Sequence, residues 1–284
     1  MRAAPAGTAK RVTHPFLDTA RALACEAAAR LMELRLTPLV KERKADHSLV
    51  TNADHAADLI LRRGLRAAFP GHAILTEESG LDGPADAEYL WLVDPLDGTK
   101  AYAAGVTGFS VMVGLLKAGE PFAGVVIDPL EGHGYEAMKG MGAYHTFQDV
   151  KTQVHVSARR EWETMPVITS TGFPERLEKP LRSLFPGPWI PAVNSVGVKV
   201  GYLVRQLADI YINHHRVHYW DTCAPQIILE EAGGVMTHLD GQPLRYALGQ
   251  GTYRHRGATV ATHRTRHEDV LSVLRGVMPP ESSG

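Results

Sequence analysis

The sequence predicts an α/β (α+β) protein, in which a mainly antiparallel first half precedes a second half of alternating helices and strands. In the first half, two stretches of helical spacing are followed by apolar runs joined through short turns that contain glycine. In the second half, short apolar runs alternate with stretches of helical pattern. A chain of 284 residues can form one large domain or two closely packed halves. We expect halves at 1–150 and 151–284 that form one compact unit.

The first half opens with two expected helices. Residues 16–36 are rich in Ala, Leu, Arg and Glu with apolar residues three and four apart, and Pro38 ends this helix. Residues 52–69 form the second, which stops at Pro70-Gly71. The expected hairpins pair 109–116 with 122–128 and 135–139 with 142–146.

The elements expected in the second half are shorter. They are a strand at 167–171, helices at 174–184 and 199–207, a strand at 210–212, a helix at 225–232, and a hairpin of 235–238 with 243–245. The locally basic run 254–267 contains only Tyr253 as a neighbouring aromatic, so we expect a solvated face rather than a nucleic-acid site.

Composition limits the function classes. A hydrophobic content of 44% and a charged content of 21% are those of a soluble globular enzyme. A net charge of −1 gives no bulk attraction to nucleic acid or membranes. Cys25 and Cys223 lack metal-ligand spacing, and neither a signal sequence nor a membrane-spanning stretch is apparent. We therefore expect a cytoplasmic protein with no membrane or nucleic-acid partner.

The most informative segment is W-L-V-D-P-L-D-G-T-K, residues 91–100. An apolar strand ends in two carboxylates, Asp94 and Asp97, and Pro95 turns the backbone so that Leu96 can offer its carbonyl. Hard anionic oxygens and a carbonyl suit Mg²⁺. Gly98 lets the backbone approach a ligand, and the N–H groups of Gly98 and Thr99 can point at an anion. Carboxylates beside an anion cradle indicate phosphate-ester chemistry.

Alone, D-P-L-D-G could be an ordinary surface turn. Two further strand or helix ends also deliver acids, however. Glu77 follows the apolar run 72–75 in T-E-E-S-G, and Asp221 opens the expected helix in Y-W-D-T-C-A-P. Carboxylates at three separate strand or helix ends indicate one shared site rather than a surface turn.

These blocks, with the 44–54 segment, resemble the inositol monophosphatase superfamily of Mg²⁺-dependent, lithium-sensitive phosphomonoesterases over about residues 13–264. The resemblance implies a five-layered αβαβα sandwich, a small phosphorylated substrate and a homodimer. It further implies two to three Mg²⁺ ions, most of whose ligands lie in the first half.

The resemblance also implies a role for each site residue. Glu77, Asp94 and the Leu96 carbonyl would hold one ion, while Asp94, Asp97 and Asp221 would hold a second. Asp54, in V-T-N-A-D, would bind the Thr99 hydroxyl, and this catalytic pair would orient the metal-activated water and accept its proton. A covalent aspartyl-phosphate at Asp94 is the rival mechanism, but a carboxylate shared by two metals is a poor nucleophile.

The substrate contacts that we expect are Gly98, Thr99, Thr169, Ser195 and Lys199. The Ser195-x-x-x-Lys199 spacing resembles the 3′(2′),5′-bisphosphate nucleotidase branch, in which the lysine meets a second phosphate. This favours hydrolysis of 3′-phosphoadenosine 5′-phosphate to AMP and phosphate.

Two alternatives stay open. The first alternative is an inositol-1-phosphate phosphatase or a broad sugar-phosphate phosphatase, because T-G-F-P at 171–174 is typical of inositol-type members. The second is a role in binding RNA-processing or transcription partners, which predicts loss of the metal carboxylates, yet all of them are present.

Overall fold

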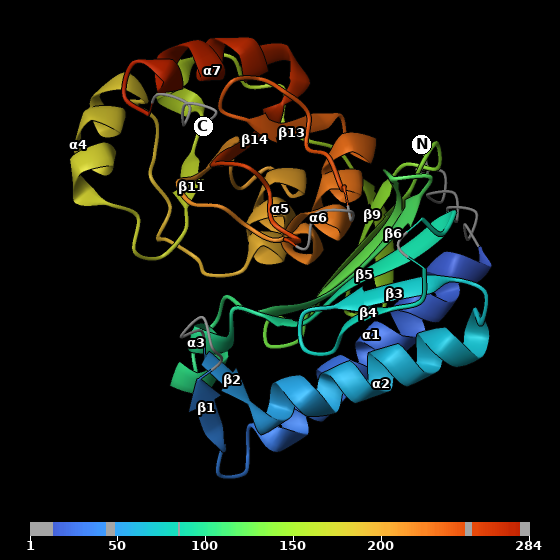
Figure 1. The fold of residues 1–284 in the computed structure, drawn as a ribbon. Helices are drawn as coiled ribbons and strands as arrows, with labels where there is room; N and C mark the ends of the chain where they lie inside the picture. Colours follow the sequence, from blue (N-terminus) through green and yellow to red (C-terminus); the bar gives the residue numbers. More distant parts are fainter. Residues whose placement is uncertain (1–13, 44–48, 85, 248–251, 279–284) are drawn as a thin grey trace, which may run out of the picture.

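A computed structural model describes residues 14–43, 49–84, 86–247 and 252–278, which form five layers (Figure 1). An outer pair of helices, α1 (Pro15–Leu34) and α2 (Asn52–Ala68), covers an eight-stranded sheet. Helices α5 (Val196–Val204) and α6 (Tyr219–Glu231) separate it from a four-stranded sheet. Helices α4 (Glu175–Leu184) and α7 (His267–Arg275) cover the far face. The predicted αβαβα sandwich is confirmed.

The large sheet has the strand order β10-β9-β8-β7-β6-β5-β3-β4 and is antiparallel except for the β3–β5 pair. Its strands are β3 (Ala73–Thr76), β4 (Gly80–Asp82), β5 (Tyr89–Asp97), β6 (Ser110–Lys117), β7 (Glu120–Asp128), β8 (His133–Met138), β9 (Ala143–Phe147) and β10 (Val150–Val154). β10 was not predicted. It carries the large sheet four residues past the expected boundary at 150.

The small sheet has the order β11-β12-β14-β13, in which β11 and β12 are parallel and the other pairs antiparallel. The remaining elements are β11 (Val167–Thr169), β12 (Ile210–Asn213), β13 (Gly234–His238), β14 (Thr259–His263), the hairpin β1 (Lys41–Arg43) and β2 (Leu49–Thr51), α3 (Thr99–Ala104), and the 3₁₀ turns η1 (Trp162–Thr164) and η3 (Arg264–Arg266).

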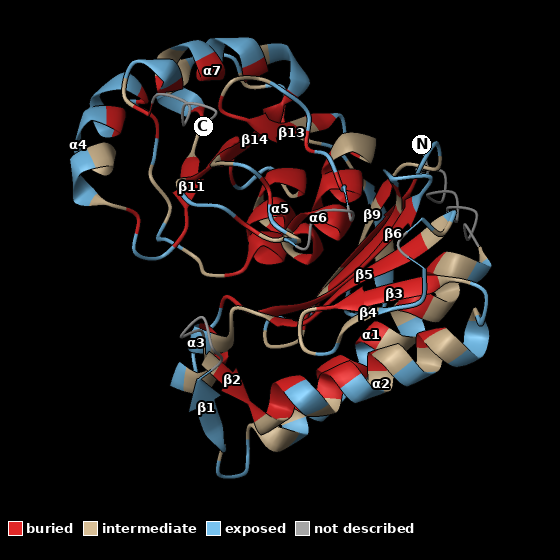
Figure 2. Ribbon diagram, in the orientation of Figure 1, coloured by how far each residue is buried: buried red, intermediate tan, exposed pale blue. Residues whose placement is uncertain are grey.

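The layers follow from side-chain alternation along the strands. In β5, Trp91 and Val93 pack toward α1 and α2, whereas Leu92 packs toward α5 and α6. Figure 2 shows the result, with buried strands in the middle of the molecule and exposed residues on the outer helices. Among the described residues, no helix combines the length and the apolar character that crossing a membrane requires.

Several predicted boundaries need correction. β5 does not stop at Asp94 but runs through Pro95 to Asp97. A bulge between Asp94 and Asp97 leaves Pro95 unpaired, so the strand can contain a proline that has no N–H to donate. α6 begins at Tyr219 and carries Pro225 inside it, so Asp221 lies in its first turn. The expected strand 243–245 is only an isolated bridge of Pro243 with Thr237.

The basic run 254–267 is not simply a solvated face. It contains β14, η3 and the start of α7, and His255, His263 and His267 are buried. Basic and apolar residues alternate in this run because it forms a strand and the start of a helix, and each of these elements buries some of its side chains.

Two glycines bring α6 close to the large sheet. Gly114 of β6 and Gly124 of β7 are register partners. A Cβ on Gly114 would lie 2.6 Å from Cys223 Sγ, and one on Gly124 would lie 2.7 Å from Ala224 Cα. The close approach of this helix therefore depends on the absence of side chains at both positions.

We predict that Gly124→Ala lowers the free energy of unfolding by about 1–3 kcal/mol, because the added methyl meets helix backbone that cannot yield. Gly71→Ala is the matched control, since nothing lies within 4 Å of its added Cβ. Urea unfolding measures both. Equal stability of the two variants would contradict the close packing of α6.

The buried His267 predicts an acid dependence of stability. Its ring nitrogens lie 2.8 Å from Thr237 Oγ1 and 3.0 Å from Thr262 Oγ1, and burial lowers its pKa to about 4 from an ordinary 6.5. Between pH 6.5 and pH 4 this imidazole is protonated in the unfolded chain but neutral in the folded protein. The free energy of unfolding therefore falls as the pH falls. We expect His267→Gln to reduce this slope in unfolding measured from pH 7 to pH 4. An unchanged slope would show that His267 contributes nothing to it.

Candidate active site

A cleft of about 210 Å³ lies where β3, β5, α3, α6 and the segment before α5 meet. Its lining residues are Leu49, Glu77, Asp94, Leu96, Asp97, Gly98, Thr99, Lys100, Asn194 and Asp221. All five residues predicted to hold metal line this one cleft, although they come from three separate stretches of the chain.

The bulge at the end of β5 sets the geometry of the first carboxylates. Asp94 is buried, and its Oδ1 accepts a hydrogen bond of 3.0 Å from the N–H of Leu96. Gly98 then takes a φ of 92°, and a Cβ there would lie 2.5 Å from the Gly108 carbonyl oxygen. Only glycine fits this position without strain.

Asp97 is fixed by the start of α5. Its Oδ2 accepts hydrogen bonds of 2.6 Å from both Ser195 Oγ and the N–H of Val196. Ser195 Oγ, whose proton goes to Asp97, lies 2.8 Å from Ser110 Oγ, so Ser110 is the donor in that pair. These contacts use one carboxylate oxygen and do not involve Oδ1.

Asp221 is held in the same manner at the start of α6. Its Oδ2 accepts a 2.7 Å hydrogen bond from the N–H of His218. Arg254 Nε donates to His218 Nε2 over 2.6 Å, so the ring proton lies on Nδ1, which is 3.8 Å from Asp221 Oδ2. The His218 ring also stacks on Trp220 at 4.5 Å. His218 and Arg254 are positioning residues that the sequence did not reveal, because their contact joins segments 36 residues apart.

The cleft is electrostatically unbalanced. Burial raises the pKa of Asp94 well above its usual value, and the charges of Glu77, Asp97 and Asp221 raise it further. Burial and the Asp221 charge raise the pKa of Asp97 to about 6. Converging acids whose ionisation is this unfavourable need a cation to balance them.

The donor set suits a hard divalent cation. Each of the three aspartates has one oxygen bound to a backbone N–H, and these bonds leave the second oxygen for another ligand. Within the described ranges, however, no three His, Cys, Asp or Glu side chains are already arranged to hold an ion. The donor atoms of the site therefore suit a metal ion, although these side chains are not arranged in a complete coordination shell.

The predicted catalytic pair lies together. Thr99 Oγ1 is 3.1 Å from both Asp54 Oδ1 and the Leu96 carbonyl oxygen. Thr51 donates its N–H and its hydroxyl to Asp54 Oδ2 over 2.8 and 2.6 Å. Burial raises the pKa of Asp54, against the effect of these hydrogen bonds. Thr51 was not predicted, although its capping-box spacing to Asp54 is visible in the sequence.

The expected substrate residues divide into two groups. Gly98 and Thr99 line the cleft, but Thr169, Ser195 and Lys199 do not. Thr169 is a buried strand residue, and Ser195 is committed to Asp97 and to the N–H of Val198.

Lys199 lies in the interior rather than at the cleft. It is fully buried, and its Nζ donates to Ser170 Oγ and to the carbonyls of Val193 and Asn194 over 2.7–2.9 Å. Burial lowers its pKa to about 8. All three ammonium protons are used, so this placement gives the predicted phosphate contact no support. The cation that lines the cleft, among the residues described, is Lys100.

Comparison with known proteins agrees with this arrangement. The model of the inositol monophosphatase family matches residues 13–278. The chain is 33% identical over 208 residues to the 3′(2′),5′-bisphosphate nucleotidase CysQ of Aggregatibacter actinomycetemcomitans, covering 72% of this chain and 77% of that protein. It is 30% identical over 240 residues to the chloroplastic phosphatase IMPL1 of Arabidopsis thaliana, covering 80% of this chain and 63% of IMPL1.

A solved inositol monophosphatase from Anabaena superposes with a TM-score of 0.74 at 32% identity, covering 94% of this chain and 97% of that structure. The family match spans both sheets and every carboxylate of the cleft. The chain therefore belongs to the inositol monophosphatase family.

Proposed function

We propose that this chain is a Mg²⁺-dependent phosphomonoesterase that hydrolyses small phosphate esters. The observation that carries the proposal is the convergence of Glu77, Asp94, Asp97 and Asp221 on one cleft beside Thr99. Membership of a family of phosphatases supports it.

Glu77, Asp94, Asp97, Asp221 and the Leu96 carbonyl would hold the metal. A divalent cation there supplies Lewis acidity, which neutralises phosphoryl oxygens and lowers the pKa of water. The protein supplies orientation and a base. The Thr99 hydroxyl, donating to Asp54, presents its lone pairs to a water in the cleft, and the raised pKa of Asp54 makes that carboxylate a better proton acceptor.

As substrate we propose 3′-phosphoadenosine 5′-phosphate, supported by the similarity to the relative named CysQ. With Lys199 buried, Lys100 is the cation that the described lining of the cleft offers to a second phosphate, and it follows Thr99 directly. The burial of Lys199 itself favours a second candidate, a monophosphate such as inositol 1-phosphate, which carries no second phosphate to bind.

The first prediction is metal dependence. Chelation should abolish turnover, Mg²⁺ or Mn²⁺ should restore it, and the larger Ca²⁺ should block it. Mg²⁺ should also raise the melting temperature of the wild type and of Asp86→Asn, an exposed carboxylate outside the cleft, but not that of Asp94→Asn. Full activity after exhaustive chelation would refute the proposed chemistry.

The second prediction concerns the catalytic pair. Thr99→Ala and Asp54→Asn should each lower kcat by about 10²–10⁴-fold, because the first removes the link between the water and the proton acceptor and the second removes the acceptor itself. Thr99→Ser keeps the hydroxyl and should retain most activity, as should Thr107→Ala at an exposed position nearby. The Mg²⁺-induced rise in melting temperature should persist in Thr99→Ala. A normal kcat in Thr99→Ala would assign water activation to another group.

The third prediction separates the substrates by steady-state kinetics. If Lys100 meets a second phosphate, Lys100→Ala should raise KM for 3′-phosphoadenosine 5′-phosphate by roughly ten- to a hundredfold and leave inositol 1-phosphate hydrolysis nearly unchanged. A wild type that prefers inositol 1-phosphate, with a Lys100→Ala variant that treats both substrates alike, would select the second candidate.

A further inference from the structure

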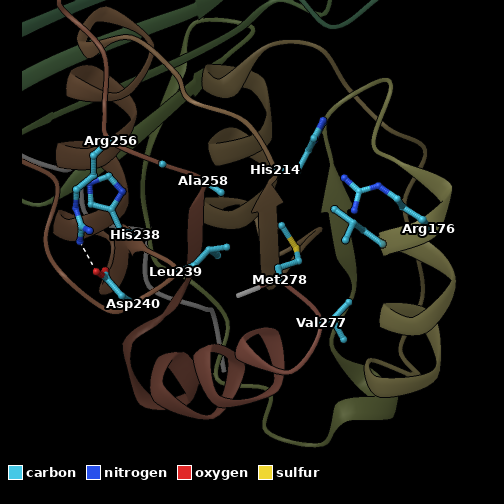
Figure 3. Close-up of a pocket in the computed structure, with 11 residues that line it drawn as sticks. Arg176, His214, His238, Leu239, Asp240, Arg256, Ala258, Val277 and Met278 are labelled. Carbon is cyan, nitrogen blue, oxygen red and sulfur yellow. Dashed lines mark hydrogen bonds and ion pairs between the residues drawn. The ribbon is translucent and has the colours of Figure 1, made fainter. Parts of the chain in front are cut away.

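A second cavity, of about 290 Å³, lies in the layer between the small sheet and helices α4 and α7 (Figure 3). Its lining residues are Arg176, Leu177, His214, His238, Leu239, Asp240, Arg256, Gly257, Ala258, Val277 and Met278. None of them lines the catalytic cleft, which borders the starts of α5 and α6 on the other side of the small sheet. The cavity is thus a separate feature.

The charged groups of this cavity are not balanced. Arg256 is ion-paired with Asp240. Arg176, by contrast, makes no hydrogen bond or ion pair with any part of the chain that the structure describes, and Figure 3 shows its side chain on the His214 side of the cavity. The lining therefore carries one uncompensated guanidinium, a group whose planar donors match carboxylate and phosphate oxygens.

Two histidines add unused polar atoms to the lining. His238 is 94% buried, and its Nδ1 lacks a hydrogen-bond partner among the described residues although the Ala258 backbone contacts the ring. Nδ1 of His214 is likewise buried and unpaired. Buried polar atoms without partners are rare in folded proteins, and a bound ligand is one way to satisfy them.

Between these polar ends the cavity is apolar. Leu239, Val277 and Met278 line it, as Figure 3 shows, with Arg176 and the Arg256–Asp240 pair on opposite sides. A concave site with an apolar wall and a few placed polar groups is the usual form of a small-molecule site.

We propose that this cavity binds a small organic oxyanion, a carboxylate or a phosphate monoester. The anionic group pairs with Arg176, the carbon body lies against Leu239 and Met278, and His214 and His238 provide neutral hydrogen-bonding groups. Either source of the oxyanion satisfies the same chemistry, so both are tested.

The test is a titration of the protein with two probes, succinate and glycerol 2-phosphate, after divalent cations have been removed so that the proposed phosphatase activity does not consume the ester. Histidine ε1-¹³C NMR signals of His214 and His238, assigned by substitution to Gln, report binding. The His238 signal identifies this cavity, because the ring of His214 contacts His215, which interacts with Asp221 of the catalytic cleft. We expect saturable shifts of both signals with at least one probe. Arg176→Ala should weaken that binding by roughly ten- to a hundredfold.

Two variants control the test. Lys179→Ala removes an exposed cation of the same helix that does not line the cavity, and it should bind as the wild type does. Arg176→Lys keeps the charge but loses the planar fork, so its affinity should lie between those of the wild type and Arg176→Ala. Absence of saturable shifts with both probes, or equal affinity in the wild type and Arg176→Ala, would overturn the proposal.

Discussion

Asp97 ties the large sheet to the layer of helices that carries the small one. Its backbone ends β5, while its Oδ2 accepts from Ser195 Oγ and the N–H of Val196 at the start of α5. A helix start is a favourable place for negative charge, because its N–H groups are unpaired and its dipole is positive there. The position of the cleft depends on this junction, since Asn194, one residue before Ser195, forms part of its wall.

The same region explains why Lys199 faces inward. Its ammonium crosslinks Ser170, Val193 and Asn194, which lie on two segments leading to the cleft. A buried ammonium is costly unless every proton is used, and here all three are. Lys199 thus fixes the position of the segment before α5, from which Ser195 donates to Asp97. The nearby charges of Asp97 and Asp221 favour the protonated form of Lys199.

Much of the fold could be predicted from the sequence because its signals are local. Helices α1 and α2 begin and end within about two residues of expectation, and the acids at the ends of β3 and β5 do meet. β14 was missed because it is a central strand buried throughout, so it shows no polar alternation. The burial of Lys199 and the contact of His218 with Arg254 were not predicted, because these contacts join segments up to 36 residues apart, and no local pattern encodes them.

The position of a bound divalent cation tests most directly whether the carboxylate cleft is the catalytic metal site. Crystals grown with Mn²⁺ would reveal it in an anomalous difference map. We predict at least one peak among the carboxylates of Asp94, Asp97 and Asp221, within bonding distance of the oxygens that the backbone N–H groups leave unused. No peak in the cleft, with Mn²⁺ bound elsewhere in an active enzyme, would contradict the assignment of these carboxylates.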